Sequence, residues 1–154
     1  MLAVGVFEAQ HVENVWKRLG QTMSGITDLE QLLASMEPRL VDGEFVFCTV
    51  KGSLAEYLML DILGSFKEQE GLTLILPKLQ AEQAELDFEG VFRMITLNVH
   101  SSLEAVGLTA AVSNKLAERD ISANVVAAYY HDHIFVQSSK ADEALAALKE
   151  FLSE

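Results

Sequence analysis

Three histidines and one aspartate with ligand-binding chemistry lie in two short segments of the chain. His100 follows a β-type segment, and Asp132 lies between His131 and His133 further along. A neutral imidazole binds zinc, nickel or copper and transfers protons, whereas a carboxylate binds an ammonium group. Each residue also has an ordinary structural role, because aspartate often forms turns and histidine often hydrogen-bonds at a sheet edge. Their function therefore depends on whether the fold brings them together.

The residues after His100 lead into the longest helical pattern of the sequence, at 101–118. Free backbone N–H groups at a helix N-terminus favour an anion such as a carboxylate. Ser101 and Glu104 match a capping box, which is the ordinary explanation of both residues. Gly107 allows the close approach of a ligand or of another backbone segment.

The second half of the chain has the order strand, helix, strand, strand, helix. This order is the split βαβ arrangement of the ferredoxin-like fold, an α+β fold that usually has one more strand. We expect the first half to supply that strand, so that two domains interleave. The expected elements are strand 92–99, helix 101–118, strand 122–130, a tight turn at 131–132, strand 133–137 and helix 140–152.

The ferredoxin-like order also predicts which segments meet. Right-handed crossover connections place the last strand of this half beside its first strand. His100, the segment 101–107 and the hairpin 131–133 then lie at one edge of the sheet. We therefore expect a ligand site at this edge, where the joint location favours function more than any single residue does.

The first half begins with a helix signature at Thr27, and Glu30 completes a capping box with it. Pro38 and the pair Asp42-Gly43 are expected to end that helix and form a turn. Beyond the turn we predict strands at 44–50 and 72–77, a short helix at 78–86, and either a helix within 52–64 or a strand at 62–68. We divide the chain into a leader at 1–22, a first domain at 23–89 and a second domain at 90–154.

Composition excludes several classes of partner. The formal net charge of −12 repels phosphate backbones and anionic lipid heads, so we expect no nucleic-acid and no membrane partner. Cys48 is the single cysteine, which rules out a disulfide within the chain, and we interpret it as a buried apolar residue. We expect no signal peptide and no membrane span, and hence a cytoplasmic location.

Six segments together resemble an uncharacterised bacterial family of tandem ACT-domain proteins, related to the regulatory ACT domains of aspartate kinase but without a kinase domain. The resemblance covers nearly the whole chain after Met23. Its segments are 24–36 (SGITDLEQLLASM), 44–50 (EFVFCTV), 70–77 (EGLTLILP), 100–111 (HSSLEAVGLTAA), 121–126 (ISANVV) and 129–136 (YYHDHIFV).

The resemblance implies a ferredoxin-like regulatory module that binds a small molecule, with an amino acid as the expected ligand. It implies no catalytic activity, no cofactor, and a homodimer or a partner enzyme. Gly107 stands at the family's loop glycine and Asp132 at its hairpin aspartate, whereas Val106 replaces the usual proline before that glycine. The ligand-binding residues expected on this basis are His100, Ser101, Ser102, Glu104, Val106, Gly107, Asp132 and His133.

Two alternatives stay open at this point. One is a metal-binding protein or histidine-based enzyme that uses His100, His131 and His133, although no cysteine is nearby. The other is a ligand-free protein-interaction module, because a sheet that lacks a strand has an edge that pairs readily with another chain.

Overall fold

A computed structural model describes residues 28–99 and 106–152 of the chain. The first helix, α2 (Leu29–Ser35), begins after Asp28, whose side chain accepts a hydrogen bond of 2.9 Å from the backbone N–H of Gln31. The sequence pattern predicted Thr27 as the cap, whereas the cap in the structure is Asp28. Aspartate caps a helix at least as well as threonine, so a shift of one residue costs nothing. The expected leader at 1–22 lies outside the described residues.

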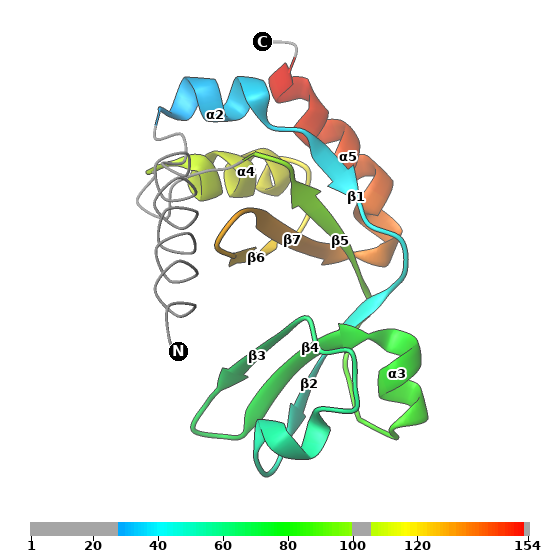
Figure 1. The fold of residues 1–154 in the computed structure, drawn as a ribbon. Helices are drawn as coiled ribbons and strands as arrows, with labels where there is room; N and C mark the ends of the chain where they lie inside the picture. The colour runs from blue at the N-terminus through cyan, green and yellow to red at the C-terminus, as the bar shows by residue number, and fades with distance from the viewer. Residues whose placement is uncertain (1–27, 100–105, 153–154) are drawn as a thin grey trace, which may run out of the picture.

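The described strands form one antiparallel sheet (Figure 1). Its order is β3-β4-β2-β5-β7-β6, and β1 pairs with β5 outside this path. The strands are β1 (Pro38–Leu40), β2 (Phe45–Val50), β3 (Gly64–Lys67), β4 (Leu72–Pro77), β5 (Phe92–Leu97), β6 (Asn124–Ala127) and β7 (Asp132–Gln137).

The sheet consists of two parts that are joined at a single register pair, Phe45 with Phe92. We call β3, β4 and β2 the first half-sheet, and β1, β5, β7 and β6 the second half-sheet. Figure 1 shows α3 (Lys78–Gln83) beside the first half-sheet, whereas α2, α4 (Leu108–Ala117) and α5 (Ala141–Lys149) lie with the second.

Strand β1 completes the second half-sheet. Pro38 pairs with Leu97 and Leu40 with Ile95, so β1 lies antiparallel to β5. The resulting order β1-β5-β7-β6 is the ferredoxin-like order, with α4 and α5 as its helices. The expected strand from the first half is thus confirmed. The sequence did not identify it, because three residues are too few to show a strand's alternation and Pro38 indicated a turn.

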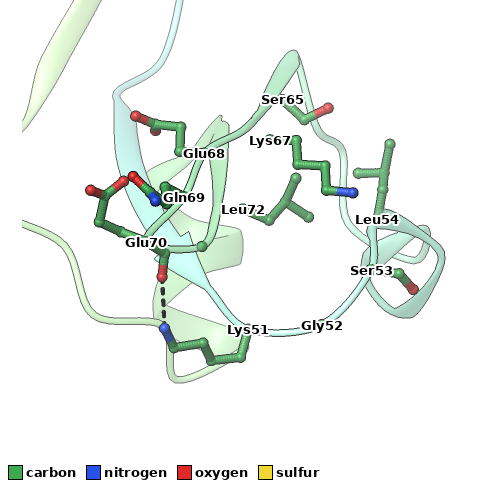
Figure 2. Close-up of a pocket in the computed structure, with 11 residues that line it drawn as sticks. Lys51, Gly52, Ser53, Leu54, Ser65, Lys67, Glu68, Gln69, Glu70 and Leu72 are labelled. Carbon is green, nitrogen blue, oxygen red and sulfur yellow. Dashed lines mark hydrogen bonds between the residues drawn. The ribbon is translucent and has the colours of Figure 1, made fainter.

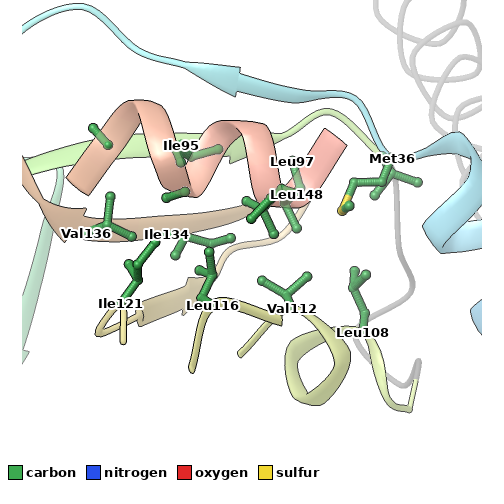
Figure 3. Close-up of a cluster of buried hydrophobic side chains, with 14 of the residues drawn as sticks. Met36, Ile95, Leu97, Leu108, Val112, Leu116, Ile121, Ile134, Val136 and Leu148 are labelled. Atoms are coloured by element: carbon green, nitrogen blue, oxygen red, sulfur yellow. The ribbon is translucent and has the colours of Figure 1, made fainter. Parts of the chain in front are cut away.

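The larger core lies between the second half-sheet and its helices (Figure 3). Side chains from β5, β7, α4 and α5 point toward one another there, and Met36, just after α2, lies at one end of the cluster. Leu32 and Met36 are both 0% exposed. Burying side chains of this size contributes roughly 1.5–3 kcal/mol each. The domain boundary at 89–90 stays a prediction, but in space α2 and β1 pack with the second half.

A smaller core lies under the first half-sheet. Val46, Leu74 and Leu76 pack there with Ala81 of α3, and the 3₁₀ helix η1 (Leu54–Tyr57) adds Tyr57 at its margin. Cys48 is buried in the same cluster, and burial raises the pKa of its thiol. This environment confirms that Cys48 is a buried apolar residue.

The other face of the sheet carries an aromatic cluster across the junction. Phe47 makes edge-to-face contacts with Phe92 and Phe135, at centroid distances of 5.3 Å in both cases. Phe45 and Phe135 are in a similar contact at 6.0 Å. These rings hold the two half-sheets together where the backbone ladder has only one pair.

Two predicted boundaries in the second half were wrong. Helix α4 begins at Leu108, since Val106 and Gly107 are not helical. The hairpin turn lies at Tyr129 and Tyr130, with a hydrogen bond of 3.1 Å from the N–H of Ala128 to the carbonyl of His131. The tyrosines favoured a strand and Asp132 favoured a turn, so the pattern placed the turn too late.

The C-terminal helical prediction was continuous, whereas the structure divides it into η2 (Ser138–Lys140), α5 and η3 (Glu150–Leu152). No helix among residues 28–99 and 106–152 is long and apolar enough to cross a bilayer.

Candidate functional site

Asp132 is a buried carboxylate at the start of β7. It pairs in register with Leu97 of β5 and Ala127 of β6, and its side chain is only 7% exposed. It shares its strand face with Ile134 and Val136, which both belong to the core beneath the helices. Within the described part of the chain, no side chain or backbone group hydrogen-bonds its carboxylate.

Burial raises the pKa of Asp132, and the neighbouring His133 and His131 oppose this effect only in part. A carboxylate that is largely removed from water is costly, because desolvation disfavours its charged form. A cation placed against Asp132 would relieve this cost. The residue is therefore suited to bind an ammonium group.

Gly107 turns the chain into α4. Its φ of 104° lies in the left-handed region, and a Cβ there would lie 3.0 Å from Cδ2 of Leu29. A larger residue would thus be both strained and crowded. Val106, just before it, is 82% exposed. As a glycine, Gly107 supplies no side-chain cap to α4, although its carbonyl accepts a 2.9 Å hydrogen bond from the N–H of Ala111.

Strand order places the N-terminus of α4 and Asp132 at the same end of the second half-sheet. Leu97, the register partner of Asp132, belongs to the same buried cluster as Leu108, the first residue of α4. Backbone N–H groups at a helix N-terminus attract a carboxylate, whereas Asp132 attracts an ammonium group. The two features together match the two ends of a zwitterion. His100, Ser101, Ser102 and Glu104 lie outside the described residues, so their roles stay predictions.

His131 stabilises the end of β5. Its Nδ1 lies 3.3 Å from the carbonyl oxygen of Val99. A carbonyl only accepts, so this hydrogen bond requires the proton on Nδ1. His131 thereby links the hairpin to the chain that follows β5.

His133 lies on the opposite face of the sheet from Asp132. Neighbouring residues of a strand point to opposite faces, and the Nδ1 of His133 contacts the hydroxyl of Thr96 at 3.0 Å. Burial lowers the pKa of His133, His131 lowers it further, and Asp132 opposes both. The sequence analysis placed His133 and Asp132 in one site, but in the structure their side chains point to opposite faces of the sheet.

The described residues give the metal alternative no support from geometry. His100 is outside the described residues, and the other two histidines each use Nδ1 in a contact with the protein. Among the residues that the structure describes, no group of three or more His, Cys, Asp or Glu side chains is arranged to hold a metal ion.

The first half-sheet has a pocket in the topologically equivalent place (Figure 2). In each half-sheet a strand leads through a loop into a helix, and the next two strands form a hairpin beside that loop. The pocket has a volume of about 710 Å³ and lies between the loop 51–54 and the hairpin 67–72. Sequence reasoning missed it because its polar residues are spread over two segments. The repeated strand, loop and hairpin order was the available signal.

Both signs of charge line this pocket. The ammonium group of Lys51 donates a 2.7 Å hydrogen bond to the carbonyl of Glu70. Glu68, Gln69 and Glu70 lie together on the hairpin in Figure 2, and Lys67 lies on the side of Ser53 and Leu54. Glu56 accepts from the N–H of Ser53 at 2.8 Å and so fixes the start of η1. The pocket therefore offers groups for both ends of a zwitterion.

Comparison with known proteins gives two family matches. Residues 24–93 match one model of the ACT domain, and residues 89–150 match a second model of the ACT domain. No match to this chain was found among curated protein sequences.

Solved structures give similar results. A Vibrio cholerae protein of unknown function, described as a possible transport protein, is 59% identical, with 84% of this chain and 99% of that chain covered and a TM-score of 0.75. The regulatory subunit of aspartate kinase from Thermus thermophilus is 10% identical, with coverages of 76% and 97% and a TM-score of 0.59. A protein from Agrobacterium tumefaciens is 16% identical, with coverages of 76% and 89% and a TM-score of 0.63. The last two likenesses concern the fold alone.

Proposed function

This chain belongs to the family of tandem ACT-domain proteins, and we propose that it is a cytoplasmic regulatory module that binds an amino acid and has no catalytic activity of its own. The observation that carries the proposal is the buried carboxylate of Asp132, which has no hydrogen-bond partner among the described residues. The regulatory aspartate kinase subunit of similar fold supports a regulatory role.

In the proposed complex, the amino group of the ligand binds Asp132 and its carboxylate binds the N-terminus of α4 at Gly107. The ammonium group replaces the solvation that burial removes from Asp132, and the helix dipole favours the carboxylate. His100, Ser101, Ser102 and Glu104 are proposed to complete the site from the intervening loop. Val106 is proposed to border the site from its exposed position.

The pocket of the first half-sheet is proposed as a second position for a ligand of the same kind. Lys67 would bind a carboxylate there, and the acidic hairpin would bind an amino group. Its open, charged lining differs from the buried edge at Asp132, so the two positions need not prefer the same amino acid.

A module without catalytic activity acts through the surfaces it presents to a second copy or to a partner enzyme. Bound ligand shifts such an equilibrium only through its different affinity for the two states. We propose a homodimer as the resting assembly, in which the ligand changes the affinity between subunits or for the enzyme.

A thermal-shift screen tests the proposal. The full chain is heated with each of the twenty amino acids, with zinc, with nickel and with a chelator. A ligand that binds only the folded state raises the melting temperature. We expect one or a few amino acids to do so, and the increase to vanish in Asp132→Asn. Asp42→Asn, which removes one exposed carboxylate from a loop, is the matched control.

The other outcomes select the alternatives. An increase with metal, or a decrease with chelator, supports a metal-binding protein that uses His100, His131 and His133. No response to any compound supports a ligand-free interaction module. An amino-acid response that persists in Asp132→Asn contradicts the proposed site.

A further inference from the structure

A further cavity, which we call the cleft, lies on the face of the sheet that points away from the helices. It has a volume of about 250 Å³. Gly64 and Ile75 line it from the first half-sheet, and Met94, Val126 and Phe135 line it from the second, with His133 as its polar residue. The site at Asp132 is on the opposite face of the same sheet, so this cavity is separate from it.

The position of the cavity shows that the two half-sheets face each other. Strands β3 and β6 are the outermost strands of the order β3-β4-β2-β5-β7-β6, yet Gly64 of β3 and Val126 of β6 line the same space. The sheet must therefore bend at its junction, where Phe45 and Phe92 form the single pair. A molecule in this cleft contacts both half-sheets at once.

The chemistry of the residues that line the cleft indicates which class of ligand fits it. Apart from His133, its lining residues are apolar or glycine. Thr96 engages Nδ1 of His133 at 3.0 Å, which leaves Nε2 for a single hydrogen bond to a ligand. An apolar cavity of about 150 Å³ is large enough for benzene, so about 250 Å³ leaves room for one ring or two fused rings.

We propose that this cleft binds a small uncharged aromatic molecule whose one polar group bonds to His133, and that the bound molecule fixes the angle between the two half-sheets. A charged ligand is disfavoured because nothing in the lining balances its charge. Since the contacts come from both half-sheets, binding is strongest at one angle and shifts the population toward it. The inference goes beyond the amino-acid site and does not depend on it.

Indole is a suitable probe, because it is uncharged, has two fused rings and has one N–H group. It is titrated into the full chain with labelled methyl groups, and binding is followed by NMR. We expect saturable shifts at the methyl groups of Ile75, Met94 and Val126. No saturable shift up to the solubility limit of indole, or shifts centred instead on the exposed Leu58 and Met59, would overturn the proposal.

Gly64→Val fills the cleft. A Cβ at this position would lie 3.6 Å from Cδ1 of Ile75, an ordinary contact, and Gly64 does not have a positive φ. We expect the affinity for indole to fall at least about tenfold, since the added side chain occupies the ligand's space. If this variant does not fold, Val126→Phe fills the same cleft from the opposite wall. Unchanged affinity in a folded filling variant overturns the proposal.

Two further measurements distinguish a ligand-binding cleft from the amino-acid site and from a contact between subunits. Asp132→Asn should leave indole binding unchanged, whatever it does to amino-acid binding; loss of indole binding there would overturn the separation of the sites. If Gly64→Val changes the oligomeric state of the protein in the absence of indole, the cleft belongs to a subunit contact and the proposal is wrong.

The angle between the half-sheets is tested with spin labels at Gln69→Cys and Tyr129→Cys, both exposed hairpin positions on different half-sheets. Cys48 is buried and should stay unlabelled. We expect indole to narrow the distribution of distances between the labels. A distribution that does not change at saturating indole overturns the proposed effect on the angle.

Discussion

The two half-sheets repeat one arrangement with different packing. In the second half-sheet the loop after the first strand leads into α4, a helix of 10 residues, whereas in the first it leads into η1, a 3₁₀ helix of 4 residues. The longer helix packs on the second half-sheet through Leu108, Val112 and Leu116, and Asp132 of that half-sheet is buried. The shorter one leaves the equivalent edge as an open pocket lined by Lys67 and Glu68. The two half-sheets thus share a topology but differ at equivalent edges, with a buried carboxylate in the second and an open pocket in the first.

The cores of the two half-sheets also differ in the segments of the chain that form them. The second half-sheet receives both β1 and α2 from the first half of the chain, and its core includes Leu32 and Met36. The core of the first half-sheet receives Ala81 from α3 and, at its margin, Tyr57 from η1. The second half is therefore expected to depend on residues that precede it in sequence by more than fifty positions.

The largest effect that we predict tests this dependence. Leu32→Ala removes a side chain with 0% exposure from the core of the second half-sheet. We expect a loss of about 2–5 kcal/mol in the free energy of unfolding, because a cavity remains. Leu79→Ala, at an exposed position of α3, is the control and should change stability by less than about 0.5 kcal/mol. Equal effects in chemical denaturation would show that α2 does not belong to this core.

The next prediction distinguishes the cost of backbone strain at a positive φ from the cost of steric crowding by Leu29 at the start of α4. Gly107→Ala places a Cβ about 3.0 Å from Leu29 at a positive φ, whereas Gly43→Ala meets no atom within 4 Å at a φ of 96°. Strain alone costs about 1 kcal/mol, and crowding adds to it at Gly107. We expect Gly107→Ala to be destabilising by about 2–3 kcal/mol and Gly43→Ala by about half of that. Similar values in urea denaturation would show that Leu29 moves aside freely.

Asp132 gives the third prediction, which concerns pH. Its pKa is raised in the folded state, so its protonated form favours folding, and this stability is lost as pH rises from the ordinary pKa through the folded pKa. Without ligand, Asp132→Asn should be more stable than the natural chain at neutral pH, by about 1–3 kcal/mol, because it removes a buried charge that has no hydrogen-bond partner among the described residues. The two proteins should have similar melting temperatures at acidic pH. A less stable variant at neutral pH would mean that Asp132 has a stabilising cation partner.

Sequence reasoning succeeded where a long pattern decides the structure. Strand 72–77 was predicted with the bounds of β4, because its apolar run is flanked by Gly71 and ends at Pro77. The ferredoxin-like order and the donated strand were also predicted. The donor β1 was missed, since a three-residue strand is determined by its partner β5 rather than by its own pattern.

The candidate site was only partly predictable for a similar reason. Strand order alone predicts Asp132 near the start of α4, which stays a prediction, whereas the burial of Asp132 could not be predicted. The error of two residues in the hairpin turn placed Asp132 and His133 in one loop, whereas on a strand they point to opposite faces. The pocket of the first half-sheet depends on the short η1, and 52–64 fitted more than one element in the sequence.

The smallest effect on stability is predicted for the open pocket. Lys67→Met keeps most of the side chain's volume and removes its charge, and no ion pair to Lys67 is present among the described residues. We expect a change of less than about 0.5 kcal/mol in the free energy of unfolding, because surface substitutions without partners rarely do more. Amino-acid binding in the first half-sheet should nevertheless weaken, while the response that depends on Asp132 is retained. Calorimetric titration counts the sites directly: two sites in the natural chain and one in Lys67→Met would support two ligand positions. A single site in both proteins, still dependent on Asp132, would show that the open pocket binds no ligand and that only the buried edge does.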